Sequence, residues 1–168
     1  VMYNVLIVDD DTLMRDTLRA MISRFKNFQI IGEAASGSEA VSICRHYPVH
    51  LIFMDIIMPG ITGIEASKKI KEVSPQTEIC ILSAYSDFHF AKEAMELHIK
   101  KYFSKPVSIL DINHYLENFS LSSFEVSLKD RLRSFFRLHI APQEERGLQA
   151  ILHKHVRRFL AEHRELTV

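Results

Sequence analysis

Acidic side chains follow two short apolar segments of the sequence, and together they could bind a metal ion. Residues Asp9 to Asp11 come directly after the segment Tyr3 to Val8, and Asp55 directly follows the segment His50 to Met54. Carboxylates that lie close together repel one another unless a cation is present. Hard oxygen ligands of this kind suit Mg²⁺, which binds through a few carboxylates and phosphate oxygens. Any one of these aspartates alone is more typical of a helix cap that faces water.

A hydroxyl group and an ammonium group follow two further apolar segments. Ser83 comes after Glu78 to Leu82, and Lys105, followed by Pro106, comes shortly after Tyr102 to Phe103. Because the carboxyl ends of parallel strands meet at one edge of a sheet, these side chains are predicted to share a pocket with the aspartates. The set supplies what a phosphoryl group needs: a nucleophile, charge neutralisation and donors for its oxygens.

The segments that must position these side chains alternate in type along the chain. Short apolar runs, predicted to be strands, occur at Tyr3 to Val8, Gln29 to Glu33, His50 to Met54, Glu78 to Leu82 and Tyr102 to Phe103. Amphipathic stretches separate these runs and leave room for one helix after each strand. Right-handed crossovers then predict an α/β fold, a doubly wound five-stranded parallel sheet with its ligand site at the carboxyl ends of the strands.

Capping signals and helical periodicity locate several of the intervening helices. Two capping boxes, Ser36 with Glu39 and Thr62 with Glu65, predict where two helices begin. Apolar residues recur at helical spacing in two further stretches: Met14, Leu18, Met21, Ile22 and Phe25, and then Ile112, Tyr115, Leu116 and Phe119.

In order and spacing, four motifs resemble the receiver domains of two-component response regulators. They are VLIVDD at Val5 to Asp10, MDIIMPGITG at Met54 to Gly63, LSAYSD at Leu82 to Asp87 and YFSKP at Tyr102 to Pro106. The resemblance covers about residues 3 to 119 and implies the flavodoxin-like fold of that family. The stretch from Ser83 to Val107 is most similar to receivers that precede an arabinose-regulator-type DNA-binding output.

The resemblance implies a role for each residue of the acidic site. Asp55 is implied to be the phosphoacceptor, which takes a phosphoryl group from a sensor histidine kinase. Asp9 and Asp10 are implied to hold Mg²⁺ together with Asp55, with the backbone carbonyl of Ile57 as a further ligand. Asp11 is surplus to this set and is expected to cap a helix. The protein would be a phosphoacceptor switch that catalyses only its own phosphorylation and dephosphorylation, not an enzyme acting on a metabolite.

The same resemblance assigns the residues that respond to phosphorylation. Ser83 matches the switch hydroxyl and Tyr102 the switch aromatic residue. Lys105 matches the lysine that contacts the phosphoryl group, and its bond to Pro106 is commonly cis in the family.

The sequence departs from the family pattern at two places. His98 and Ile99 stand before the fifth strand, where Gly-Ala is common. Gly would cap the fourth helix there in the left-handed region, which His tolerates less well. Thr62 stands where Asp is common, and it serves equally as a cap. Both changes could alter the face of the fourth helix and fifth strand, where these domains usually pair.

Composition is that of an ordinary globular protein with one domain and an appendage. The 168 residues include 21 Lys+Arg and 21 Asp+Glu, so the formal net charge is zero, and 47% are hydrophobic. No apolar run approaches the ~20 residues that a membrane span needs, and the start lacks a signal peptide, so a cytoplasmic location without membrane contact is expected.

Cys44 and Cys80 fit no metal-binding pattern and are predicted to be reduced core residues.

Charge divides the chain into two parts. Residues 1–119, the predicted receiver domain, include 12 basic and 15 acidic residues, whereas residues 120–168 include 9 and 6. Residues 120–123 are predicted to be a linker and residues 124–168 a two-helix extension. Three interpretations of the extension stay open: a bundle that pairs with a second chain as a homodimer, the start of a truncated output domain, or direct nucleic-acid binding. DNA is expected as a partner only if an output domain follows or the basic extension binds it.

Two other classes of function account for part of the pattern. A haloacid-dehalogenase-like phosphatase also uses aspartate, Mg²⁺ and lysine, but its Asp-x-Asp motif is missing because Ile56 and Ile57 follow Asp55. A phosphorylation-independent interaction or dimerisation module with a relic acidic pocket does not account for the full set of polar side chains. A response regulator that controls an output such as transcription is therefore the main hypothesis.

Overall fold

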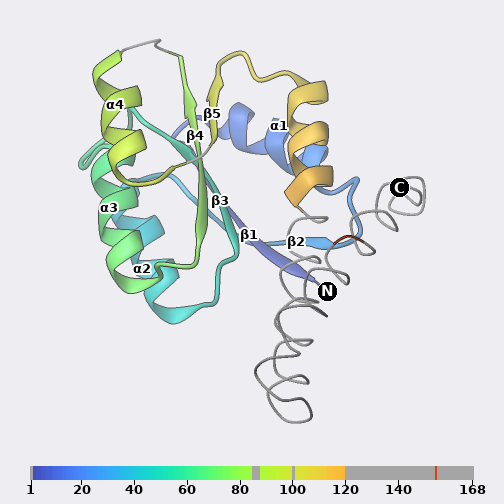
Figure 1. Ribbon diagram of the computed structural model, residues 1–168, viewed down its shortest axis with the longest axis horizontal. Coiled ribbons are helices and arrows are strands. Elements are labelled where there is room, and N and C mark those ends of the chain that lie inside the picture. The colour runs from blue at the N-terminus through green and yellow to red at the C-terminus, as the bar shows by residue number, and fades with distance from the viewer. Residues whose placement is uncertain (1, 85–87, 100, 120–153, 155–168) are drawn as a thin grey trace. The chain divides into compact units, whose positions relative to one another are not determined.

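The computed structural model describes residues 2–84, 88–99, 101–119 and 154 (Figure 1). Its elements are β1 (Tyr3–Val8), α1 (Thr12–Ile22), β2 (Phe28–Ala34), α2 (Gly37–His46), β3 (Leu51–Asp55), α3 (Gly63–Val73), β4 (Glu78–Ser83), α4 (Phe88–Glu96) and β5 (Lys101–Ser104). Residues 109–119 are also helical. The chain divides into two units, Val1–Asn113 and His114–Val168, and the first contains the whole sheet. The predicted linker at 120–123 and the extension at 124–168 lie outside the described residues, apart from Lys154.

The five strands form one parallel sheet in the order β2-β1-β3-β4-β5. Helices α2, α3 and α4 lie on one side of the sheet and α1 lies on the other (Figure 1). Because both faces are covered, the central strands are nearly continuous apolar runs, and every residue of β3 is buried. The chain adds β2 on one side of β1 and β3 on the other, and folds of this kind bind ligands in the crevice where the order reverses. The predicted α/β fold is confirmed.

Alternate residues of β1 pack on opposite faces of the sheet. Leu6 and Val8 belong to a buried cluster to which α2, α3 and α4 contribute. Val5 and Ile7 alternate with them, are equally buried, and therefore face the side that α1 covers. A shift of one residue would exchange the two sets, so the pleat holds the acidic residues after β1 in one position along the edge.

Two expectations from composition concern thiols and membrane spans. Cys44 in α2 and Cys80 in β4 are both buried, as predicted for core cysteines. Among the described residues, no helix has the length and apolar character to span a bilayer.

The two predicted capping boxes differ in the structure. Thr62 and Glu65 form the complete box at the start of α3, because each side chain accepts a hydrogen bond from the backbone N–H of the other. At α2, Ser36 Oγ accepts from Glu39 N–H at 3.3 Å, but the Glu39 carboxylate accepts from Ala35 N–H rather than from Ser36. The predicted start of α2 at Ser36 is therefore confirmed, but the reciprocal half of its capping box is wrong, since the Glu39 carboxylate bonds to the residue before the N-cap.

Helix α1 ends earlier than its apolar pattern predicts. The helix closes at Ile22, and Phe25 lies beyond it, where its N–H donates to the carbonyl of Ile22 at 3.0 Å in a tight turn. Phe25 instead packs edge-on against Phe28, with ring centroids 6.1 Å apart. Helical spacing alone therefore does not distinguish the last residues of a helix from an aromatic residue in the turn that follows it.

His98 adopts the backbone conformation for which glycine is common in the family. Its φ angle is 57°, in the left-handed region, two residues after the end of α4. The following residue, Ile99, donates its N–H to the carbonyl of Ala94 at 3.0 Å, which closes the end of the helix. The left-handed cap is therefore formed although histidine replaces glycine, and the β-carbon costs roughly 1 kcal/mol relative to glycine.

Candidate functional site

Asp9 and Asp10 lie directly after β1 but differ in their surroundings. Asp9 is completely buried, whereas Asp10 is exposed. The Asp9 N–H donates to the carbonyl of Ala34 at 3.1 Å, and Asp9 Oδ1 accepts from Asp11 N–H at 2.9 Å. Asp11 caps α1, as predicted, because its side chain accepts from the N–H of Leu13. The sheet therefore holds Asp9 rigidly, and the start of the helix leaves Asp10 facing solvent.

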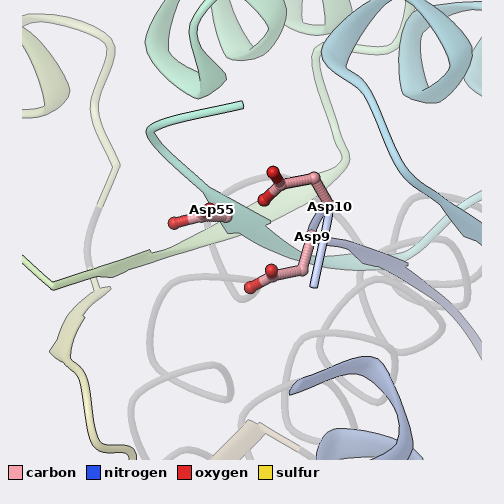
Figure 2. A group of neighbouring side chains, drawn as sticks. All are labelled: Asp9, Asp10 and Asp55. Carbon is pink, nitrogen blue, oxygen red and sulfur yellow. The ribbon is translucent and has the colours of Figure 1, made fainter. Parts of the chain in front are cut away.

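Asp55 is the last residue of β3 and is 6% exposed. Val8 pairs with Met54 across the neighbouring strands, so Asp9 and Asp55 follow paired positions. One carboxylate oxygen from each of Asp9, Asp10 and Asp55 lies within 4.8 Å of the other two. Figure 2 shows these side chains pointing to the same side of the sheet edge. The acidic cluster predicted from the sequence is confirmed.

Lys105 supplies a positive charge to this cluster. Its Nζ lies 2.7 Å from Asp9 Oδ2 and 3.1 Å from Asp55 Oδ1. The backbone holds the residue in place, because Lys105 N–H donates to the carbonyl of Ser83 at 2.7 Å and the Lys105–Pro106 bond is cis. One ammonium faces three carboxylates, so the cluster keeps an excess of negative charge.

The ionisation of the pocket reflects this imbalance. Burial raises the pKa of the Asp55 carboxyl, and the charge of Asp9 adds to the rise, while Lys105 and the Ile56 N–H oppose it. Burial lowers the pKa of Lys105, but its hydrogen bonds to Asp9 and Asp55 outweigh that effect and the net change is a rise. The ammonium is thus held in its charged form, and the charged form of Asp55 is stabilised by any further cation that enters.

Ser83 and Ile57 lie at the same edge of the sheet, and Tyr102 lies two residues before the end of β5. Ser83 ends β4 and is 1% exposed, one residue beyond the position that pairs with Asp55. Tyr102, in β5, pairs with Ile81 and packs against the core cluster. Ile57 is two residues beyond β3, and its side chain is half exposed.

Gly63 also shapes the site, although the sequence pattern assigned it no role. A Cβ atom on Gly63 would lie 1.9 Å from the carbonyl oxygen of Asp55. The Gly63 N–H donates to the carbonyl of Ile56 at 2.8 Å. The first turn of α3 therefore packs directly on the backbone of Asp55, and only glycine fits there. The one signal in the sequence was a glycine directly after the N-cap Thr62, a position where most residues are tolerated.

The sequence matches the response regulator receiver domain family over residues 5–117. The chain belongs to this family. It is 35% identical over 117 residues to an uncharacterized transcriptional regulatory protein, YesN, of Bacillus subtilis. This alignment covers 69% of this chain and 32% of YesN. It is 36% identical over 104 residues to the response regulator UvrY of Escherichia coli, with 62% and 48% covered. The chain thus spans less than half the length of either relative.

Solved receiver structures have the same fold. A CheY-like receiver domain from Methanospirillum hungatei superimposes with a TM-score of 0.66 at 21% identity, covering 70% of this chain and 93% of that one. The chain of a CheX-CheY-BeF3-Mg²⁺ complex from Borrelia burgdorferi superimposes with a TM-score of 0.64 at 28% identity, covering 70% of this chain and 88% of that one. The receiver domain of AraT from Geobacillus stearothermophilus gives 0.63 at 28% identity, with 68% and 90% covered. The predicted receiver fold and family are confirmed, and the alternative of a relic pocket is not favoured.

Proposed function

We propose that this receiver domain is the phosphoacceptor of a two-component phosphorelay and that Asp55 takes the phosphoryl group from a phosphohistidine of a sensor kinase. The observation that carries the proposal is the placement of Asp55 beside Asp9, Asp10 and Lys105. The contacts of Asp55 with the Ile56 N–H and with Lys105 both use Oδ1. Oδ2 is therefore the oxygen assigned to attack phosphorus.

The donor set of the pocket fits Mg²⁺. Asp9, Asp10 and Asp55 offer hard carboxylate oxygens that lie close together, and a single ammonium leaves their charge uncompensated. These residues, with the backbone carbonyl of Ile57, would hold the ion, which would neutralise charge on the phosphoryl oxygens during transfer. The Borrelia burgdorferi complex that contains CheY, BeF3 and Mg²⁺ supports this proposal.

In the transfer, Asp55 Oδ2 forms a bond to phosphorus while the phosphorus–nitrogen bond of the donor phosphohistidine breaks. The electron pair of that bond returns to the donor imidazole, which takes up a proton. Lys105 donates to a phosphoryl oxygen from its position between Asp9 and Asp55. The Ser83 hydroxyl, at the end of the adjacent strand, donates to another. The chain thereby promotes its own phosphorylation and dephosphorylation and no reaction of a metabolite.

The proposed output is a change in packing at β4 and β5. When the Ser83 hydroxyl turns toward the phosphoryl group it vacates space, and Tyr102 turns inward to fill it. Leu13, in the first turn of α1, and Ile57 expose apolar side chains a few residues from the carboxylates, which suits a protein phosphodonor. The name of the Bacillus subtilis relative, a transcriptional regulatory protein, supports control of transcription as the output. We further propose that the protein acts in the cytoplasm and forms a homodimer through residues 124–168. Contact with DNA would come through an output domain or through the basic extension.

The test is labelling with acetyl phosphate and Mg²⁺, followed by intact mass spectrometry. Wild-type protein should gain the mass of one phosphoryl group, and Asp55→Asn should gain none because it lacks the nucleophilic oxygen. Asp111→Asn, which removes an exposed carboxylate elsewhere, is the matched control and should label normally. Wild-type labelling of Asp55→Asn would disprove the assignment.

A further inference from the structure

Arg15, in the first turn of α1, connects the turn that carries Asp9 and Asp10, here called the acidic turn, to the rest of the fold. Its side chain is 16% exposed, and all three guanidinium nitrogens have acceptors. Nη1 donates to the carbonyl of Asp9 at 2.7 Å and to that of Asp10 at 3.3 Å. Nη2 donates to Thr12 Oγ1 at 3.2 Å, and Nε donates to Glu33 Oε2 at 3.3 Å. The guanidinium thus binds the backbone of the two acidic residues and not their carboxylates.

These contacts complete the restraints on Asp9. Its N–H is bound by Ala34 of β2, its Oδ1 by the Asp11 N–H and its Oδ2 by Lys105. The carbonyl contact from Arg15 is the fourth. For Asp10, whose carboxylate is exposed, the carbonyl contact from Arg15 restrains the backbone that aims this side chain at the cluster.

Glu33 orients the guanidinium from the neighbouring strand. It lies in β2 opposite Ile7 of β1, close to where the acidic turn begins. Glu33 Oε2 pairs with Arg15, and Oε1 accepts from Arg19 Nε at 2.6 Å. Arg19 is 47% exposed and also pairs with Asp16. Arg15 and Arg19 therefore share one carboxylate, but of these two described arginines only Arg15 also contacts Asp9 and Asp10.

We propose that Arg15, aligned by Glu33, is a positioning residue that holds Asp9 and Asp10 in the geometry that binds the divalent cation. The inference rests on the function proposed above. Two effects of the guanidinium oppose each other. Its charge repels a cation in the pocket, whereas its hydrogen bonds order two ligands before the ion arrives. Because the guanidinium bonds to the carbonyl side of the turn and is already paired with Glu33, ordering is expected to outweigh repulsion.

The experiment measures Mg²⁺ affinity by isothermal titration calorimetry on the full chain, at a temperature where every variant is folded. Arg15→Gln should bind Mg²⁺ about tenfold more weakly, as is typical when a residue that supports metal ligands is removed. Arg15→Lys keeps the charge but cannot span the carbonyls and Glu33 together, so it should lose at least threefold. Arg19→Gln, which removes the other partner of Glu33, is the matched control and should stay within twofold of wild type.

A second readout requires no metal. Hydrogen exchange of the Asp11 N–H, which donates to Asp9 Oδ1, should be about tenfold faster in Arg15→Gln and unchanged in Arg19→Gln. Unchanged or tighter Mg²⁺ binding by Arg15→Gln would overturn the proposal, as would an equal loss in Arg19→Gln. If Arg15→Gln does not fold, Arg15→Lys decides by the same two measurements. If wild type itself fails to bind Mg²⁺, the proposed function fails, and the exchange rates alone decide whether Arg15 positions the turn.

Discussion

Replacing Gly63 with alanine tests how closely the position of Asp55 depends on the start of α3. The new Cβ would lie 1.9 Å from the carbonyl oxygen and 2.8 Å from the carbonyl carbon of Asp55. Ordinary contacts of this kind begin at 3.4 Å, so the two backbones must separate by about 1.5 Å. The atoms in the way are backbone atoms, which cannot turn aside as a flexible side chain can.

The free energy of unfolding should fall by about 3 kcal/mol. Overpacking of this kind costs about 1–3 kcal/mol, and separation of the backbones also weakens the 2.8 Å bond from Gly63 N–H to Ile56, worth about 1 kcal/mol. The higher helix propensity of alanine returns up to about 1 kcal/mol. For a domain of this size the melting temperature should fall by roughly 10 °C. A shift of about 1 Å in Asp55 should also slow phosphorylation by acetyl phosphate about a hundredfold.

Two other glycines provide controls for thermal unfolding and labelling. A Cβ on Gly32 would make only ordinary contacts, with Leu6 at 3.6 Å and Ile43 at 3.8 Å, so Gly32→Ala should unfold within about 1 kcal/mol of wild type. Gly60 has φ +87° and nothing within 4 Å of its Cβ position, so Gly60→Ala reports the conformational penalty alone, about 1–2 kcal/mol. If Gly63→Ala unfolds and is labelled like Gly32→Ala, the contact with Asp55 does not constrain the site.

Two further predictions concern the charge of the pocket and the buried thiols. In Mg²⁺-free buffer, Asp10→Asn should raise the melting temperature by roughly 2–4 °C, because it removes an exposed negative charge from a cluster of carboxylates that repel one another. Asp9→Asn should lower the melting temperature, because the buried carboxylate partner of Lys105 is lost. Differential scanning calorimetry measures both changes, and the opposite signs would contradict the prediction. Burial raises the pKa of the Cys44 thiol to about 11, so at pH 8 only about one molecule in a thousand carries the thiolate, and iodoacetamide should label Cys44 in urea but not in the native protein. Native labelling at the rate of an unfolded thiol, followed by peptide mass mapping, would contradict the burial.

Much of the scaffold was predictable because the required signals are local. The run Tyr3 to Val8 is short, mostly apolar and rich in β-branched residues, which favours a buried strand, and its bounds agree with β1. The Thr62 cap was also predictable, since a capping box depends on a few adjacent residues. Phe25 shows the limit of predicting helix ends from local sequence patterns. A tight turn and a helix can return a side chain to the same surface, and periodicity alone does not distinguish them.

The sequence by itself determined which chemical groups meet, because the carboxyl ends of parallel strands share one edge and each group follows its own strand. Only the tertiary structure decided how they differ. Asp9 is buried against Lys105, 96 residues away, while the adjacent Asp10 is exposed, so substitutions at these two neighbouring aspartates are expected to change stability in opposite directions. The contact of Gly63 with Asp55, like the contacts of Arg15, depends on where a helix packs against a strand end. Such positions come from the packing of segments distant in sequence, which no local pattern of residue types encodes.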